Sequence, residues 1–315
     1  MATFQTPQPI AVVVDISVRA DIRAVAREGN DTVVSVRPRK ERRSLDVRMA
    51  EQTTVDYSDG RLQVRLHPGF RHSWFSDGGA VEITVEVPVG SSLELKSAMG
   101  DLHCDGKFGA ADLRTDLGHI TIDHCGELRA HTDMGDIAVQ RASGRSRIKT
   151  GSGKIRILHI DGVATVKNGN GSTYIAHASG ELSVSAANGD ISLERAGLST
   201  TVKTSSGDIT VGEVAAGSLS VQTAAGTLAV GVREGTAAWL DLNTKYGRVR
   251  NALQATSGPG DTTDKVDIRA RNAYGDIAVT RSPVSARQAW LHGSDGPLPA
   301  GLGESRTDQP LPRTE

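Results

Sequence analysis

The sequence predicts an all-β protein built as a repeat β-solenoid, and three observations support this. One short phrase recurs along the chain, for example as HTDMGDIAV at 131–139, KTSSGDITV at 203–211 and RNAYGDIAV at 271–279. The copies are nearly evenly spaced, which is typical of stacked repeats rather than of one globular unit. Aromatic residues make up only 3 % of the 315 residues, whereas glycine contributes 35. That composition suits many tight turns around small apolar side chains.

The glycine of each phrase serves as an anchor for measuring the period. Successive anchors are 18, 17, 18, 18, 18, 18, 19, 21 and 28 residues apart, which predicts about ten rungs of about 18 residues. The long last step contains LQATSGPGDTTDK, an insertion that we expect to loop out of one rung. The anchors are Gly100, Gly118, Gly135, Gly153, Gly171, Gly189, Gly207, Gly226, Gly247 and Gly275.

Apolar residues recur at fixed offsets from each anchor. Around Gly207 they are Val202 before it and Ile209 and Val211 after it, and most other rungs repeat this alternation. Alternation of this kind predicts two strands per rung, each with one buried face. A second glycine about nine residues after the anchor, such as Gly126, ends the second strand. Since crossovers between parallel strands are right-handed, we expect a right-handed β-helix-like coil.

Two other architectures use similar turn signals. A left-handed hexapeptide helix also has 18-residue coils, but it is disfavoured because the position four residues before the anchor is polar in every rung, as in Lys96 and Lys203. An antiparallel meander of hairpins stays open as an alternative, since Gly-Asp is also a hairpin signal.

The chain divides into three expected regions. Residues 1–90 alternate irregularly and predict a β-rich segment that caps the N-terminal end of the solenoid, with a short helix within 39–53. Residues 91–282 form the repeat domain. Residues 283–315 are rich in proline, glycine and polar residues and predict a disordered tail.

The recurring Gly-Asp pair is interpreted as a structural turn rather than a chemical site. Glycine permits positive φ, and aspartate can accept hydrogen bonds from turn amides. The aspartates of this turn set are Asp101, Asp136, Asp190, Asp208 and Asp276. Other rungs place Lys154 or Arg248 there, which a calcium-binding or catalytic column would not tolerate.

A polar column three residues before the anchor is expected to point inward at the corner of each rung. Stacked hydroxyls and amides there can bond one another and the turn backbone. This corner ladder comprises Thr115, Thr132, Thr150, Asn168, Thr204, Thr223 and Thr244.

A basic column four residues before the anchor is the most distinctive surface feature. We expect the aspartates after the anchor to offset this charge by salt bridges across the turn. The alternative is a strip that binds an acidic glycan or another polyanion, where acidic neighbours are fewest. The candidate basic binding strip consists of Arg114, Arg147, Lys149, Lys154 and Lys167.

No catalytic set, cofactor site or metal site is predicted. His159 and His177 fall in one column of adjacent rungs, but no carboxylate or cysteine shares that column nearby. Cys104 and Cys125 occupy different columns, which argues against a disulfide. The net charge of −1 predicts no specific binding to nucleic acid, and the longest apolar run near the N-terminus, IAVVV, predicts no membrane insertion.

The repeated T-x-x-G-D-I-x-V phrase, after an N-terminal segment ending EVPVGSSLELKSAMGD, resembles the bacterial putative-adhesin family of β-strand-repeat proteins, a domain of unknown function. The resemblance covers roughly residues 10–282. It implies a β-helix-like solenoid and binding at a cell surface, and it brings no catalytic residues. The chain departs from that picture in lacking an export signal, so we expect a cytoplasmic location, with the cell surface as the alternative.

The expected function is that of a non-enzymatic binding or scaffold protein that presents a repetitive surface to a protein or to a polyanionic or glycan partner. The alternative is a carbohydrate-active enzyme, because parallel β-helices host such enzymes and use clustered carboxylates in a groove. The oligomeric state does not follow from the sequence.

Overall fold

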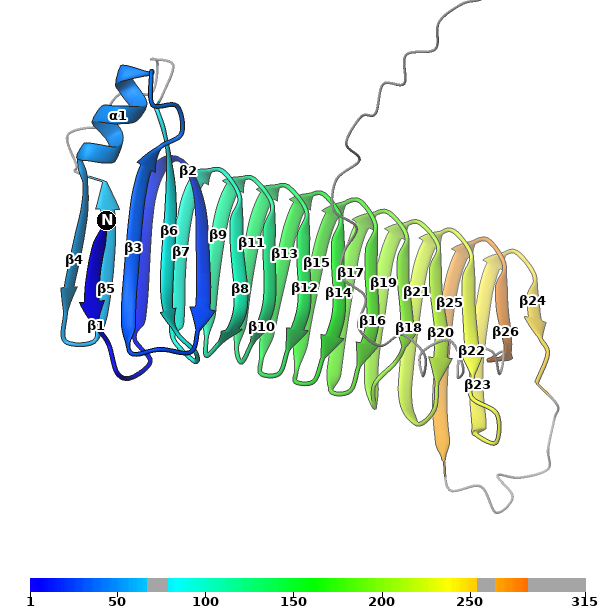
Figure 1. The fold of residues 1–315 in the computed structure, drawn as a ribbon. Helices are drawn as coiled ribbons and strands as arrows, with labels where there is room; N and C mark the ends of the chain where they lie inside the picture. The colour runs from blue at the N-terminus through cyan, green and yellow to red at the C-terminus, as the bar shows by residue number, and fades with distance from the viewer. Residues whose placement is uncertain (67–78, 254–263, 283–315) are drawn as a thin grey trace, which may run out of the picture. The chain divides into compact units, whose positions relative to one another are not determined.

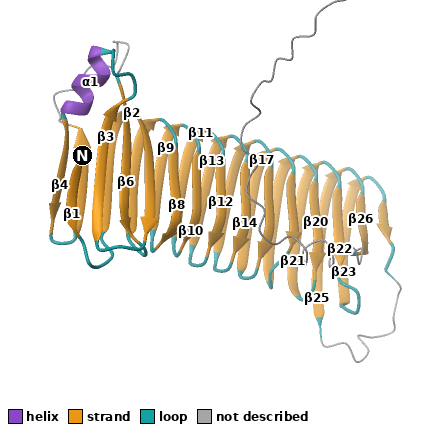
Figure 2. Ribbon diagram, viewed as in Figure 1, coloured by secondary structure: helices purple, strands orange, loops and turns teal. Residues whose placement is uncertain are grey.

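A computed structural model describes residues 1–66, 79–253 and 264–282 of the chain. Met1–Ser282 form one compact unit, and the expected tail at 283–315 lies outside the described residues. Parallel strands dominate this unit, which Figures 1 and 2 show as a row of stacked rungs. The all-β solenoid is therefore confirmed, and the parallel pairing rules out the meander of hairpins.

Each rung of the repeat consists of two strands joined by the turn that carries the anchor glycine. The odd-numbered strands stack into one sheet and the even-numbered strands into a second sheet, with the apolar core between them. The first-sheet strands are β7 (Ser92–Met99), β9 (Ala111–Leu117), β11 (Leu128–Met134), β13 (Ser146–Ser152), β15 (Ala164–Asn170), β17 (Glu181–Asn188), β19 (Ser199–Ser206), β21 (Gly217–Ala225), β23 (Ala237–Tyr246) and β25 (Lys265–Tyr274). The second-sheet strands are β8 (Leu102–Phe108), β10 (Ile120–Cys125), β12 (Ile137–Ala142), β14 (Ile155–Ile160), β16 (Thr173–Ala178), β18 (Ile191–Arg195), β20 (Ile209–Val214), β22 (Leu228–Val232), β24 (Val249–Asn251) and β26 (Ile277–Arg281).

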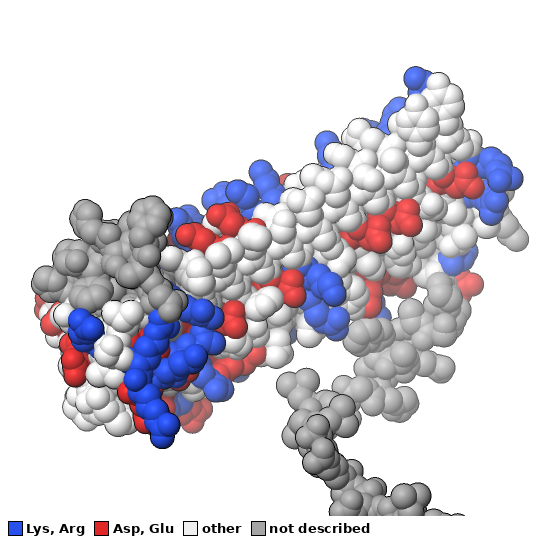
Figure 3. Space-filling view, turned by 90° about the horizontal axis from the view of Figure 1, so that it is seen from above, with Lys and Arg blue, Asp and Glu red and all other residues white. Residues whose placement is uncertain are grey.

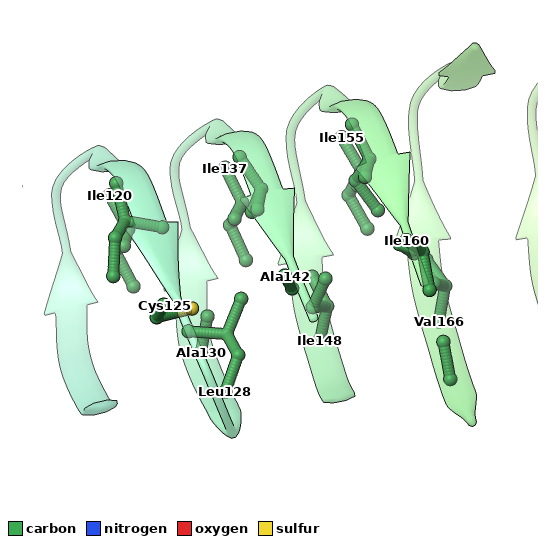
Figure 4. Close-up of a cluster of buried hydrophobic side chains, with 14 of the residues drawn as sticks. Ile120, Cys125, Leu128, Ala130, Ile137, Ala142, Ile148, Ile155, Ile160 and Val166 are labelled. Atoms are coloured by element: carbon green, nitrogen blue, oxygen red, sulfur yellow. The ribbon is translucent and has the colours of Figure 1, made fainter. Parts of the chain in front are cut away.

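The core is a set of apolar columns that run along the stack. Ile120, Ile137 and Ile155 pair in register across β10, β12 and β14, and each is at most 1 % exposed (Figure 4). Ile148 and Val166 pair in the same way across β13 and β15. Because every rung offers the same apolar face to both neighbours, burial grows by one layer per repeat.

The N-terminal segment continues the stack instead of forming a separate cap from residue 1 to residue 90. It contains β1 (Ala2–Gln5), β2 (Ala11–Arg27), β3 (Asp31–Pro38), α1 (Ser44–Glu51), β4 (Thr53–Ser58), β5 (Arg61–Leu66) and β6 (Ala80–Pro88). Strand β2 spans both sheets, since Ala11–Ile16 pair with β7 and Ile22–Val25 pair with β8. Strand β2 therefore forms one more rung of the stack, although it lies before the predicted domain boundary at residues 90/91.

Beyond β2 one more parallel layer follows, since β5 and β6 pair parallel with the two halves of β2. Antiparallel pairing then ends the stack. β3 pairs antiparallel with β6 and with β1, and β4 pairs antiparallel with β5. The rings of Phe4 on β1 and Tyr57 on β4 lie 5.2 Å apart and close the core between the two sheets. The expected short helix is α1, which packs beside β3 and β6.

The last two rungs do not stack in chain order. β25 lies between β21 and β23, and β26 lies between β22 and β24. The rung at 237–251 therefore forms the C-terminal end of the stack, as Figure 1 shows for β24. Residues 254–263, which make up most of the expected insertion, lie outside the described residues.

Candidate functional site

The repeated turn is built around glycines that no other residue can replace without strain. Gly118 has a φ of 154°, and a Cβ there would lie 2.0 Å from the carbonyl oxygen of Gly100 in the preceding rung. The same contact at Gly135 would measure 1.9 Å, to the carbonyl of Gly118. Backbones of successive rungs approach this closely only because the column has no side chain.

The side chain of the residue after the anchor accepts a hydrogen bond from the backbone N–H of the equivalent residue in the next rung. Oδ1 of Asp136 accepts a hydrogen bond from the backbone N–H of Lys154 at 2.7 Å. Asp208 does the same for the N–H of Thr227 at 2.6 Å. His119 fits among the aspartates because its Nδ1 accepts the N–H of Asp136 at 3.0 Å. These side chains therefore link successive rungs, and each already accepts a hydrogen bond from a backbone amide.

The corner ladder lies inside the molecule and bonds to carbonyls. The Oγ1 atoms of Thr115, Thr150 and Thr223 donate to the anchor-glycine carbonyl of the preceding rung at 3.0–3.1 Å. Asn168 donates through Nδ2 to the carbonyl of Gly153 at 3.1 Å. Thr244 belongs to the terminal rung and makes its bond to Gly275 at 2.9 Å. The ladder's bonds run to backbone carbonyls of the turn, and this inward column cannot contact a ligand.

The salt bridges expected between the basic column and the Gly-Asp aspartates are not formed in the described part of the chain. Arg114 instead pairs with Asp112, two residues back on its own strand, at 2.9 Å. Lys96 pairs with Glu94 in the same way. The expectation is wrong because each Gly-Asp carboxylate already accepts a backbone amide, whereas the side chain two residues along a strand lies on the same face.

Among the described residues, a group of basic side chains that form no ion pair lies close together on the outer face of the first sheet. Lys149 and Lys167 pair in register across β13 and β15, and Arg147 lies two residues before Lys149 on the same face. Arg145 immediately precedes β13. All four are exposed. We call Arg145, Arg147, Lys149 and Lys167 the basic cluster.

The structure does not bring the whole predicted strip together. Arg114 is engaged by Asp112. Lys154 follows the anchor Gly153 and immediately precedes β14 of the second sheet, on the other side of the corner. Arg145 belongs to the basic cluster but not to the strip predicted from the sequence. It lies in the turn immediately before β13, eight residues before the anchor Gly153, outside the columns that the sequence pattern defines.

A shallow groove of about 740 Å³ adjoins the basic cluster at the start of the first-sheet strands. Arg145 and Arg147 line it, together with Arg61 from β5 and Arg129 from β11. Three carboxylates also line it: Glu94, Asp112 and Glu127. The groove crosses several rungs, so an extended ligand lying in it would meet arginines from different rungs.

A second cluster on the outer face of the other sheet joins three rungs. The guanidinium of Arg156 lies 4.9 Å from the ring centre of Tyr174, and the Tyr174 hydroxyl donates to Glu194. Burial, with help from the bond to Glu194, raises the pKa of Tyr174 to about 12. The sequence signal was a single aromatic residue in a column of small and polar ones. Arg156, Tyr174 and Glu194 therefore interact with one another across the three rungs.

The histidine pair lies close but lacks further ligands. The rings of His159 and His177 are 5.9 Å apart. Burial, followed by the neighbouring His159 and Arg195, lowers the pKa of His177. Among the residues that the structure describes, no three His, Cys, Asp or Glu side chains are grouped to hold a metal ion. Cys104 and Cys125 are both buried free thiols.

Turn chemistry, parallel pairing and the absence of side chains at the anchor together define a two-sheet parallel β-solenoid. The chain belongs to the family described as Toastrack DUF4097, whose model matches residues 12–211 and 173–296. That family is a domain of unknown function with a β-repeat fold. No curated protein matches the chain.

Three solved structures are similar to the chain at low identity. A putative adhesin from Bacteroides fragilis is 11 % identical, with a TM-score of 0.36, over 88 % of this chain and 95 % of that one. A putative cell adhesion protein from Clostridium sporogenes is 7 % identical, with a TM-score of 0.22, over 89 % and 98 %. A putative adhesin from Parabacteroides merdae is 10 % identical, with a TM-score of 0.27, over 88 % and 94 %.

No helix in the described residues is long and apolar enough to cross a membrane.

Proposed function

We propose that the protein is a non-enzymatic binding protein whose basic cluster and adjoining groove hold a linear polyanion, such as an acidic glycan. The observation that carries this proposal is the group of exposed Arg147, Lys149 and Lys167 on adjacent rungs, which form no ion pair with any residue that the structure describes. Elsewhere in the same column, Arg114 and Lys96 have carboxylate partners. Lys203 also forms no ion pair with a described residue, but the rung of Ser185 separates it from Lys167. Unpaired like charges about 5 Å apart repel one another, and a bound polyanion relieves that repulsion.

The repeat gives the cluster a spacing suited to a polymer. Side chains in one column recur at the strand spacing of about 4.8 Å. An extended chain with a negative group on each unit can therefore meet Lys149 and Lys167 with successive units. Arg61 and Arg129 extend the positive lining of the groove toward the N-terminal end. Figure 3 shows that on the upper turns, by contrast, acidic and basic side chains are interspersed with uncharged surface.

The test is binding to immobilised heparin and to polygalacturonate as a function of salt. We expect Arg147→Gln, Lys149→Gln and Lys167→Gln together to weaken binding at least tenfold and to flatten its salt dependence. A matched control removes three exposed charges elsewhere, by Arg42→Gln, Arg248→Gln and Lys265→Gln. Equal losses of polyanion affinity in the two triple variants would mean that net charge, rather than the basic cluster, governs binding. That result would contradict the proposal.

The groove also supports a second candidate, a carbohydrate-active enzyme, because three carboxylates line it. Two of them are occupied: Asp112 accepts two hydrogen bonds from Arg114, and Glu94 accepts one from Lys96. A carboxylate held by a cation is a poor proton donor to a leaving group, which favours binding over hydrolysis. Release of reducing ends from an acidic polysaccharide, lost in Glu127→Gln, would instead favour the enzyme.

The location of the protein decides which polyanions it can meet. Digestion of the repeat region by protease added to intact cells would place it at the surface and direct the search to extracellular glycans. Protection until lysis would direct the search to a cytoplasmic polyanion.

A further inference from the structure

The two ends of the stack are finished differently. At the N-terminal end, antiparallel β1 and β4 and the Phe4–Tyr57 ring pair close the core. At the C-terminal end, and within the described ranges 1–66, 79–253 and 264–282, β23 pairs only with β25 and β24 only with β26. No described strand pairs with the outer edge of this terminal rung, and an edge of this kind is a template for pairing with another chain.

The core is also uncovered at this end. Leu240 and Leu242 of β23 are only partly buried, whereas Ile268 and Ala270, their partners in β25, are 0 % exposed. Trp239 is 77 % exposed. Natural sheets usually protect such an edge with proline, a bulge or several charges, but Ala237–Tyr246 contains no proline and pairs in register with β25.

The side chains of β23 are complementary to a second copy of themselves. Asp241, Asn243 and Lys245 alternate along one face of the strand. A two-fold axis at Asn243 would set β23 antiparallel to its copy, with each Asp241 opposite the other chain's Lys245. In the described residues Lys245 has no carboxylate partner and only stacks on the ring of Tyr246, at 5.3 Å. Asp241, held by Arg271 at 2.6 Å, is already oriented on this face.

We propose that two copies of the chain dimerise end to end through β23, antiparallel and centred on Asn243. The pairing continues each sheet across the two-fold axis and covers Leu240 and Leu242. It also places the two basic clusters far apart on one rod, so a long polymer could engage both with increased avidity.

The first test is a symmetric cross-link in the full-length chain. Asn243→Cys places a thiol next to its own copy at the two-fold axis, and mild oxidation should convert most of the protein to a disulfide-linked dimer. Gln222→Cys is the matched control, because Gln222 is an exposed residue of the same column inside the stack. The native thiols are buried and should not compete.

The second test is sedimentation equilibrium of the unmodified chain across a concentration series. We expect a reversible dimer whose dissociation constant rises about tenfold in Lys245→Glu, which sets Glu opposite Asp241. A monomer at every concentration overturns the proposal, as does a dimer that Asn243→Cys cannot cross-link or that Gln222→Cys cross-links equally well. Polyanion binding by the monomeric variants would show that the proposed function holds even if the dimer does not.

Discussion

The hydroxyl of Thr132 donates a 3.1 Å hydrogen bond to the carbonyl oxygen of Gly118, which belongs to the preceding rung. Thr132 is 0 % exposed, so no water can replace it at that carbonyl. The same bond recurs from rung to rung, and each copy compensates the backbone for the sharp turn at the glycine. The corner of the solenoid is therefore held by side chains as well as by the strand ladder.

Replacing Thr132 with valine should destabilise the protein with almost no change in volume. The carbonyl of Gly118 would be left buried without this donor, at a cost of about 1–3 kcal/mol in the free energy of unfolding. Urea unfolding followed by circular dichroism measures the change. Thr210→Val, at an exposed position, is the control and should change stability by less than about 0.5 kcal/mol. Equal effects at the two sites would contradict the ladder.

Adding the missing donor should stabilise the chain. Ala186 takes the ladder position in β17, where the other rungs carry Thr, Ser or Asn, and it pairs in register with Asn168. Ala186→Thr should reach the carbonyl of Gly171, as Thr204 reaches that of Gly189 at 3.5 Å. We expect a gain of about 0.5–1.5 kcal/mol in urea unfolding. A loss would mean that the partly buried pocket around Ala186 cannot accept the larger side chain.

Gly135→Ala should be far more damaging than an alanine at a comparable glycine without the close contact. Gly135 and Gly235 both have positive φ, at 154° and 80°. A Cβ at Gly135 would lie 1.9 Å from a backbone oxygen, whereas at Gly235 it would meet nothing within 4 Å. We expect about 1–2 kcal/mol for Gly235→Ala from strain alone, and more than about 4 kcal/mol or failure to fold for Gly135→Ala. Similar thermal midpoints in the two variants would refute the contact.

Acid should destabilise the protein partly through His177. Its folded-state pKa is lowered, so the unfolded state binds more protons between that pKa and 6.5. The contribution of His177 to the free energy of unfolding is fully present above pH 6.5. It is lost as the pH falls from 6.5 through the lower pKa of the folded state. Subtracting the pH profile of His177→Gln from that of the parent, over about pH 7.5 to 5, isolates this contribution. A difference profile that stays flat over this range would contradict the assignment to His177.

Both thiols should resist alkylation until the protein unfolds. Burial raises the pKa of Cys104, with smaller contributions from Asp105 and Asp123, and it raises that of Cys125 to about 12. Because the thiolate is the reactive form, iodoacetamide at pH 8 should label neither cysteine within an hour under native conditions. In denaturant, mass spectrometry should find both labelled. Rapid native labelling of Cys125 would show that its side of the core opens readily.

The rung was predictable from the sequence because its signals are local. Glycine at the anchor, apolar residues such as Ile137 and Val139 two and four positions later, and a hydroxyl such as that of Thr132 three positions earlier are set within one period. The rung of β2 was not predictable in this way because Ala20 stands where later rungs have glycine. Asp21 nevertheless accepts a hydrogen bond from the N–H of Asp101 at 3.1 Å, as the aspartates of later rungs do.

What the sequence alone determined is the repeat: its period, its two strands, its buried columns and its structural turn. Those features arise from steric and hydrogen-bonding demands inside a window of about 18 residues. The tertiary structure decided the rest. It stacked β25 between β21 and β23 and paired Arg114 with Asp112. It also left Lys149 and Lys167 without an ion pair to any described residue. Stacking order and charge pairing depend on which strand edge is free and on which side chains face one another after the chain has folded, and no local pattern records either.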